Sequence, residues 1–302
     1  MSGKRLVVTG CTGQVGGAVA RALAADNDVI GIARFADADK RAALETDGIR
    51  CVPVDLAKPD LAAVPTDVDH VLHFAVTKSG RWRTDLAANG EAVGHLMAHF
   101  AGVESFLHCS STAVYAPNGG EPMAEDDPLG DHHHDMMPTY SIAKIAAETT
   151  ARFAAAHFGV PTTIARLNVP YGDEGGWPFF HLLMLRGAIP IPVHPDGSRY
   201  NPIHHDDIVA HLPALLAAAS TPATTVNWAG DDVVSIADWV AHMAAAAGID
   251  EPDGGFVVAS DTALPSAAID TTRQHEIIGG CAVDWRTGLT RLVEANPPAA
   301  RP

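Results

Sequence analysis

Basic residues and cysteines are scarce in this 302-residue chain. Twenty Lys and Arg residues stand against 36 Asp and Glu residues, which gives a formal net charge of -16. No basic stretch could neutralise phosphates, so we expect no binding to nucleic acid or to an anionic membrane surface. The four cysteines, at positions 11, 51, 109 and 281, form no Cys-x-x-Cys pair. Scattered thiols of this kind indicate a reducing compartment.

Long apolar runs are also missing. No segment approaches the ~20 uninterrupted apolar residues of a membrane span, and the first strand-like run, Arg5–Val8, follows no apolar signal core. We therefore expect a cytoplasmic protein. The consecutive histidines in Asp131–Asp135 do not predict a metal site, because neighbouring loop histidines rarely face one ion. The long acidic loop Pro117–Pro138 that contains them is instead expected to be a lid.

Short apolar runs alternate with longer Ala-rich segments of helical spacing. The strand-like runs are Leu6–Thr9, Val29–Ala33, Cys51–Val54, Val71–Ala75, Phe106–Ser110 and Thr162–Leu167; the helical segments between them are Gln14–Ala25, Asp85–Phe100 and Ser141–Phe158. This alternation predicts an α/β fold, a Rossmann-type doubly wound parallel sheet with a small C-terminal substrate lobe. We expect a dinucleotide-binding domain at residues 1–168, with 203–248 returning to it, and the small lobe at 169–202 and 249–302.

A glycine-rich turn follows the first predicted strand. Gly10, Gly13 and Gly16 lie between that strand and a helix, where glycines permit a tight turn, backbone approach to a pyrophosphate and close helix packing. The alternative is a structural turn that binds no nucleotide. The second strand ends at Arg34, where a carboxylate would bind the ribose of NAD; an arginine can pair with the 2′-phosphate of NADP. Arg41 is a candidate helper, and the alternative for Arg34 is a solvated surface residue.

Tyr140 and Lys144 stand four residues apart near the start of a predicted helix, so their side chains share one face. A neighbouring ammonium lowers the pKa of a phenol, which otherwise titrates near ~10. The pair can therefore act as an acid and base, although an exposed surface pair is the alternative. The predicted strand Phe106–Ser110 ends in Ser110 and is followed by Ser111, at the sheet edge where active groups collect. A hydroxyl there could bind a substrate oxygen, or it could simply cap a turn at the strand end.

Together these residues resemble the extended short-chain dehydrogenase/reductase family, which contains the NAD-dependent epimerases and dehydratases. The resemblance makes Ser111, Tyr140 and Lys144 the catalytic residues. It adds an adenine-holding Asp55-Leu56, the segment His73-Phe74-Ala75 with Val76 in place of alanine, an asparagine at Asn89, and a nicotinamide-contacting strand and loop. The full set of expected cofactor-binding residues is Gly10, Thr12, Gly13, Gln14, Val15, Gly16, Arg34, Asp55, Leu56, Phe74, Ala75, Val76, Asn89, Tyr140, Lys144, Leu167, Asn168 and Val169.

Departures from the family pattern narrow the chemistry that we expect. Thr112-Ala113 replaces the Asp-Glu pair of the dehydratases, which disfavours dehydration. Tyr200 stands where sugar-nucleotide epimerases usually place a diphosphate-binding arginine, with Arg199 displaced by one position, and Arg273 or Arg286 could be a second one.

We therefore expect an NAD(P)-dependent oxidoreductase that transfers a hydride between nicotinamide and a carbonyl or secondary alcohol of a small molecule, with NADP favoured over NAD. The alternatives are an NAD-dependent sugar-nucleotide epimerase and a non-catalytic nucleotide-sensing protein. The resemblance also implies a homodimer formed by the helices Asp85–Phe100 and Ser141–Phe158.

Overall fold

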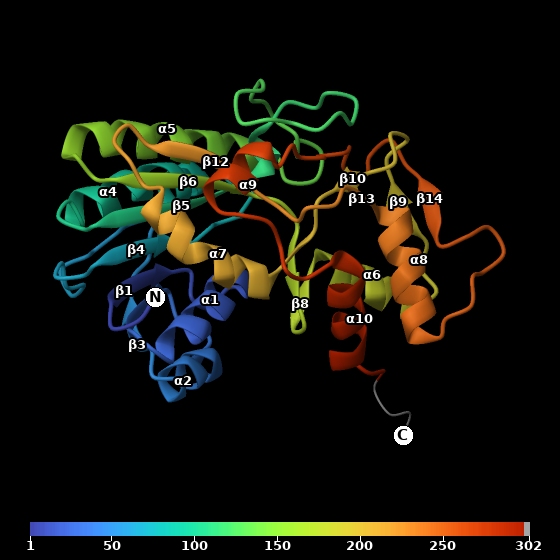
Figure 1. Ribbon diagram of the computed structural model, residues 1–302, viewed down its shortest axis with the longest axis horizontal. Helices are drawn as coiled ribbons and strands as arrows, with labels where there is room; N and C mark the ends of the chain where they lie inside the picture. The colour runs from blue at the N-terminus through green and yellow to red at the C-terminus, as the bar shows by residue number, and fades with distance from the viewer. Residues whose placement is uncertain (299–302) are drawn as a thin grey trace.

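Seven parallel strands form the central sheet of the computed structural model, which describes residues 1–298 (Figure 1). Their order is β12-β6-β5-β4-β1-β2-β3. The bounds are β1 Arg5–Thr9, β2 Asp28–Ala33, β3 Arg50–Pro53, β4 His70–His73, β5 Ser105–Ser111, β6 Thr162–Leu167 and β12 Thr224–Trp228. All six runs predicted as strands lie in this sheet, so the Rossmann-type prediction is confirmed.

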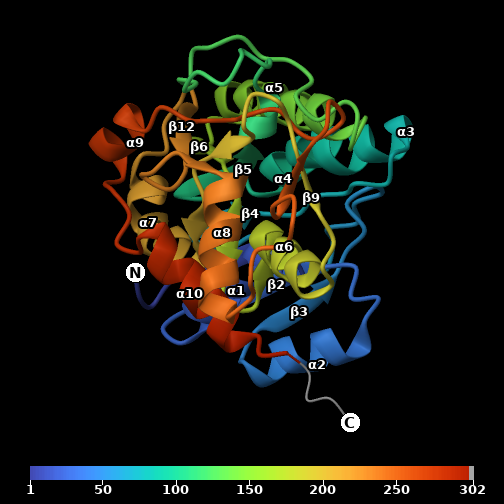
Figure 2. The ribbon, with the colours of Figure 1, turned by 90° about the vertical axis from the view of Figure 1, so that its right-hand side faces the viewer.

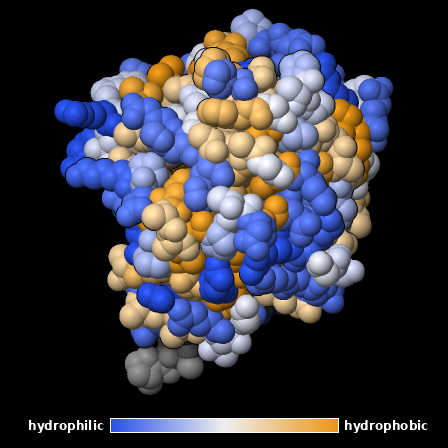
Figure 3. All heavy atoms as spheres, turned by 90° about the vertical axis from the view of Figure 1, so that its left-hand side faces the viewer, coloured by the Kyte–Doolittle hydropathy of each residue, from blue (hydrophilic) through white to orange (hydrophobic). Residues whose placement is uncertain are grey.

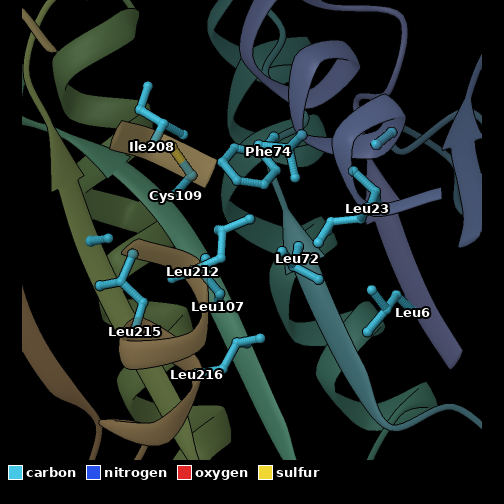
Figure 4. Close-up of a cluster of buried hydrophobic side chains, with 14 of the residues drawn as sticks. Leu6, Leu23, Leu72, Phe74, Leu107, Cys109, Ile208, Leu212, Leu215 and Leu216 are labelled. Atoms are coloured by element: carbon cyan, nitrogen blue, oxygen red, sulfur yellow. The ribbon is translucent and has the colours of Figure 1, made fainter. Parts of the chain in front are cut away.

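Helices cover both faces of the sheet, as Figure 1 shows, with α4 and α5 on one face and α1, α2 and α7 on the other. Their bounds are α1 Gln14–Ala24, α2 Ala38–Thr46, α4 Ala92–His99, α5 Tyr140–Phe158 and α7 His205–Ala217. Helix α7 illustrates why they form: Ile208, Leu212, Leu215 and Leu216 make one apolar stripe that points at β4 and β5 (Figure 4).

The segment predicted as one helix at 85–100 consists of three pieces. Helix α3 (Trp82–Asp85) leads into a π-helical turn, η1 (Leu86–Glu91), and then into α4. Short π-helical turns frequently occur at functional sites. Helix α2 was not predicted, because only its Leu44 is buried and the segment therefore carries no apolar periodicity.

The second part of the fold is a small lobe built around α6 (Trp177–Arg186), α8 (Ile236–Ala247) and α10 (Trp285–Ala295), which lie side by side in Figure 2. Helix α6 begins within a Pro- and Gly-rich stretch because Pro178 occupies its first turn, where proline is tolerated. Short strands surround these helices: β7 Pro170–Gly172, β8 Gly175–Gly176, β9 Ile191–Val193, β10 Arg199–Tyr200, β11 Ile203–His204, β13 Val234–Ser235 and β14 Val257–Ala259. The remaining short helix, α9 (Thr272–Ile277), packs near β12.

Hydrophilic and hydrophobic side chains are interspersed on the face of the molecule that Figure 3 presents. Within residues 1–298, no helix is both long and apolar enough to cross a membrane. The last four residues of the predicted lobe, 299–302, lie outside the described part of the chain.

Candidate active site

The turn between β1 and α1 approaches the end of β4 closely. Gly10 has φ +72°, and a Cβ built on it would lie 2.7 Å from the Ala75 nitrogen, so only glycine fits there. A Cβ on Gly16 would lie 2.5 Å from the Gly10 carbonyl oxygen. Helix α1 starts after Gly13, and no side chain among residues 1–298 caps its first N–H groups. Those donors and the helix dipole fit the pyrophosphate of a dinucleotide.

A cavity of about 590 Å³ opens beside this turn, between α1, the β7–β8 hairpin and the start of α7. Thr12, Gly13 and Gln14 line it, and the Gln14 side chain donates a hydrogen bond to the Pro170 carbonyl at 3.2 Å. Val15 lies in the first turn of α1, partly buried against the core. Ser111, Tyr140 and Lys144 are not among the residues that line this cavity.

Arg34 lies directly after β2 and is exposed, and no residue within 1–298 forms an ion pair with it. Its predicted helper, Arg41, is instead engaged by Glu45 at 2.8 Å and lies over the Phe35 ring at 5.7 Å. Asp55 is exposed and accepts a hydrogen bond from the Ala57 N–H at 3.0 Å, while Leu56 is buried in the core.

The chain leaving β4 is fixed by hydrogen bonds from two directions. Thr9 Oγ1 lies 2.7 Å from His73 Nδ1 and accepts from the Ala75 N–H at 3.1 Å. Asn89, buried in η1, accepts from the Thr77 N–H at 2.8 Å and donates to the Thr77 carbonyl at 2.9 Å. Asn89 is therefore a positioning residue within the protein. Phe74 is buried and Val76 is exposed on this segment.

Tyr140 is the first residue of α5, and Lys144 follows one turn later on the same face. Burial raises the pKa of Tyr140 to about 12, although the neighbouring Ser111 hydroxyl acts in the opposite direction. Lys144 is buried, and burial lowers its pKa. Its ammonium donates to the carbonyl oxygen of Cys109 on β5 at 2.7 Å. The expected lowering of the Tyr140 pKa by the Lys144 ammonium is therefore not found in this state, since burial raises that pKa instead. The phenol is protonated at neutral pH and can donate a proton.

Ser111 ends β5, and its side chain accepts a hydrogen bond from the Ala113 N–H at 3.2 Å. The structure therefore brings the predicted residues Ser111, Tyr140 and Lys144 together, at the carboxyl end of β5 and the start of α5. Ser110, the alternative hydroxyl, points elsewhere: it donates to the buried Glu148 at 2.6 Å.

The segment after β6 carries three predicted cofactor residues. Leu167 is buried in the core, and Val169 has an uncommon positive φ of 23°. The Asn168 side chain is fully engaged within the protein: it donates to Thr112 Oγ1 at 3.0 Å and to the Ala267 carbonyl at 2.8 Å, and it accepts from the Asn201 N–H at 3.2 Å.

Sequence reasoning missed two residues that flank Tyr140. The Lys78 ammonium lies 4.6 Å from the centroid of the Tyr140 ring, and the His133 ring lies 5.6 Å from it. Burial lowers the pKa of His133 to about 3, so this imidazole is neutral. His133 belongs to the predicted lid, which contacts the lobe where His132 Nε2 lies 3.0 Å from the Ser266 carbonyl. Within residues 1–298, no three His, Cys, Asp or Glu side chains converge as metal ligands.

Of the three arginines considered for a diphosphate, Arg199 and Arg273 bind other groups of the protein through their guanidinium donors, and Arg286 contacts an aromatic ring. Arg199 donates to the Gly120 carbonyl at 2.9 Å, Arg273 pairs with Asp126 at 2.9 Å, and Arg286 lies over the Trp285 ring at 4.2 Å. Tyr200, in the usual arginine position, is buried and donates to the Pro265 carbonyl at 2.7 Å.

Comparison with known proteins places these observations in a family. The family described as the NAD dependent epimerase/dehydratase family matches residues 6–227. A curated relative, the 2′-dehydrokanamycin reductase of Streptomyces kanamyceticus, is 29% identical over 232 residues, covering 70% of this chain and 58% of the relative. The chain thus matches less than two thirds of that relative's length.

Solved structures of similar fold include a UDP-glucuronic acid 4-epimerase from Bacillus cereus in complex with UDP-glucuronic acid and NAD. It has a TM-score of 0.81 at 19% identity, covering 96% of this chain and 98% of the other. A UDP-N-acetylglucosamine 4-epimerase from Methanobrevibacter ruminantium has a TM-score of 0.81 at 18% identity, with 98% of both chains covered. These matches support an enzyme over a non-catalytic nucleotide sensor. The chain belongs to the NAD-dependent epimerase/dehydratase family of extended short-chain dehydrogenases/reductases.

Proposed function

We propose that this protein is an NAD(P)-dependent oxidoreductase that moves a hydride between nicotinamide and a carbonyl or secondary alcohol of a small molecule. The observation that carries the proposal is the convergence of Ser111, Tyr140 and Lys144 at the carboxyl end of β5. The bound cofactor would supply the hydride donor or acceptor. It would lie over the glycine turn, against the free N–H groups of α1.

Each catalytic residue has a distinct task in this proposal. Tyr140 gives a proton to the substrate oxygen during reduction and takes it back during oxidation. Lys144 stabilises the phenolate that this transfer leaves behind, and its burial strengthens the interaction because solvent screening is weak. Ser111 orients and polarises the substrate oxygen.

Net oxidation or reduction is favoured over epimerisation by the arginines of the lobe. A UDP-sugar carries a diphosphate that must be neutralised, and Arg199 and Arg273 already bind other groups of the protein. The curated reductase at 29% identity agrees with this choice. We therefore expect a carbonyl substrate that carries no nucleoside diphosphate.

Sugar-nucleotide epimerisation is the second candidate, and the solved structures favour it. Solved structures of high fold similarity include UDP-sugar 4-epimerases, and they match almost the whole chain. An epimerase would return the hydride to the opposite face of the same sugar carbon, so the cofactor would show no net change.

For the cofactor, we propose NADP, with NAD as the alternative. The exposed Arg34 has no ion-pair partner within residues 1–298 and stands at the strand end where the 2′ position of the adenosine ribose would lie. The solved structures above that contain a cofactor contain NAD, which argues for the alternative.

The assembly and the domain division remain proposals. We propose a homodimer through α4 and α5; the exposed Phe153 on α5, with 64% of its surface accessible, suits such an interface. The nucleotide domain would comprise residues 1–168 together with α7 and β12. Helix α8 packs with α6 and α10, so we assign it to the substrate lobe rather than to the returning segment.

A panel of ketones, aldehydes and sugar nucleotides, each tested with NADH and NADPH, decides between these candidates. A net change in reduced-nicotinamide absorbance with a ketone or aldehyde supports the oxidoreductase. Conversion of a UDP-sugar to its epimer with no net absorbance change supports the epimerase. Tyr171→Phe is the control for Tyr140→Phe in this panel, because it removes a buried tyrosine hydroxyl of the lobe. That hydroxyl lies 3.5 Å from the Trp285 carbonyl.

A further inference from the structure

A buried carboxylate outside the predicted site joins two segments that meet at Tyr140. Asp85, the last residue of α3, has no exposed surface. It accepts hydrogen bonds from the Ser79 N–H at 3.0 Å, the Ser79 hydroxyl at 2.6 Å and the Gly80 N–H at 3.0 Å. It also accepts one from the Thr139 hydroxyl at 2.6 Å. Thr139 directly precedes Tyr140.

These hydrogen bonds keep the carboxylate charged. Burial raises the pKa of Asp85, but the donors from Ser79, Thr139 and Gly80 outweigh burial and hold the pKa below its usual value. Hydrogen bonds to a charged acceptor are among the stronger ones in proteins. Asp85 is therefore a firm link between the segment after β4 and the first turn of α5.

The segment after β4 is fixed at both of its ends. The Asn89 side chain binds both the backbone N–H and the backbone carbonyl of Thr77. The Asp85 carboxylate binds Ser79 and Gly80. Between these two anchors, Lys78 extends over the Tyr140 ring, with its ammonium 4.6 Å from the ring centroid. The anchored segment thus contacts the candidate catalytic side chain itself.

The helices that carry these anchors also pack tightly. Asp85 and Asn89 come from α3 and η1, and η1 packs on α5, where a Cβ built on Gly90 would lie 3.4 Å from the Ala146 Cβ. A shift of the Tyr140 turn relative to Lys78 would therefore have to break the hydrogen bonds at Asp85.

We propose that Asp85 is a positioning residue of the active site: by binding Thr139 and Ser79–Gly80 together, it sets the location of the Tyr140 side chain relative to the Lys78 ammonium. This role rests on the proposed function of Tyr140. The alternative is a purely structural carboxylate that stabilises the loop and leaves Tyr140 where it is.

Thr139→Val is the test substitution, because it removes the hydroxyl that binds Asp85 and keeps the side-chain shape. The Thr139 carbonyl still accepts the Ala143 N–H at 2.9 Å, so the helix start is retained. The matched control is Thr150→Val, which removes a hydroxyl that donates to the Ala146 carbonyl at 2.9 Å on the same helix.

We expect Thr139→Val to lower kcat roughly tenfold, since small displacements of a catalytic group carry costs of that order or larger. The KM for the cofactor should stay within about twofold, and Thr150→Val should match the wild type. Ser79→Ala should lower kcat in the same direction but by less, because the two N–H donors remain. Equal kcat values for Thr139→Val and Thr150→Val at equal thermal stability would overturn the proposal.

A second measurement does not depend on any activity. In protein labelled with fluorotyrosine, each of the four tyrosines gives a fluorine resonance, and Tyr140→Phe identifies the one from Tyr140. Thr139→Val should move or broaden that resonance, and Thr150→Val should leave it in place. An unmoved Tyr140 resonance in Thr139→Val refutes the positioning role, whereas full activity of Tyr140→Phe refutes only the proposed function.

Discussion

Glu148→Gln should destabilise the protein strongly, because Glu148 anchors a buried ion pair beneath the active site. Glu148 and Arg166 are 0% and 2% exposed, and they are joined by two hydrogen bonds of 2.9 Å. Glu148 also accepts from Ser110 at 2.6 Å, so it ties α5 to the strand that ends in Ser111. The neutral glutamine leaves the Arg166 charge buried and uncompensated.

Removing one partner of a buried ion pair costs about 3–5 kcal/mol. For a domain of this order of size, each kcal/mol lowers the Tm by about 2–4 °C, so the variant should melt about 10 °C earlier. Urea denaturation followed by circular dichroism measures the free energy of unfolding. The matched control is Glu45→Gln, which breaks the exposed pair with Arg41 and should cost less than about 0.5 kcal/mol.

The pH dependence of stability has a defined sign. Burial raises the pKa of Glu148, but the hydrogen bonds and charge of Arg166 outweigh it and hold the pKa below its usual value. The stabilisation is therefore complete above the unfolded-state pKa of about 4.3 and is lost as the pH falls through the folded-state pKa. Two results would contradict the role given to Glu148. One is a decrease of less than about 1 kcal/mol in the free energy of unfolding of Glu148→Gln at neutral pH. The other is that Glu148→Gln loses stability at acid pH in the same way as the wild type.

Other substitutions test the cofactor site. Arg34→Ser should raise the KM for NADPH at least about tenfold, since one charged hydrogen bond is worth about 1.5–3 kcal/mol. It should leave the KM for NADH nearly unchanged. Equal effects on the KM values of both cofactors would contradict the NADP assignment. Gly10→Ala should lower the Tm and weaken cofactor binding measured by fluorescence titration, because its Cβ would lie 2.7 Å from the Ala75 nitrogen at a φ of +72°; a stable variant with normal affinity would refute this reading of the turn.

Strand periodicity was sufficient to predict the sheet, whereas the grouping of Ser111, Tyr140 and Lys144 was implied by the family resemblance together with the four-residue spacing of Tyr140 and Lys144. The parallel sheet brings its strand ends to one edge, so residues that follow strands meet there. The break of the predicted 85–100 helix into α3, η1 and α4 was not predictable, because π-helical turns leave little trace in apolar spacing.

Residues that act through distant partners were also missed. In the sequence, Asp85 is an ordinary residue of a predicted helix. Its partner Thr139 lies 54 positions away in the chain, so no local pattern connects the two residues. Lys78 belongs to no motif, and its relation to Tyr140 arises only when the segment after β4 folds against α5. For Asn89, the sequence resemblance located the residue, but only its bonds to Thr77 reveal what its side chain holds.

In the proposed reaction, a hydride passes between cofactor and substrate while Tyr140 moves the proton. Hydride transfer is tested by following deuterium from reduced cofactor labelled at both C4 hydrogens to a carbonyl compound selected from the panel. We predict labelled alcohol from the wild type and a rate at least about 100-fold lower for Tyr140→Phe, in line with the contribution of general acid catalysis, with cofactor affinity retained. Product without deuterium, or an undiminished rate in Tyr140→Phe, would contradict the account.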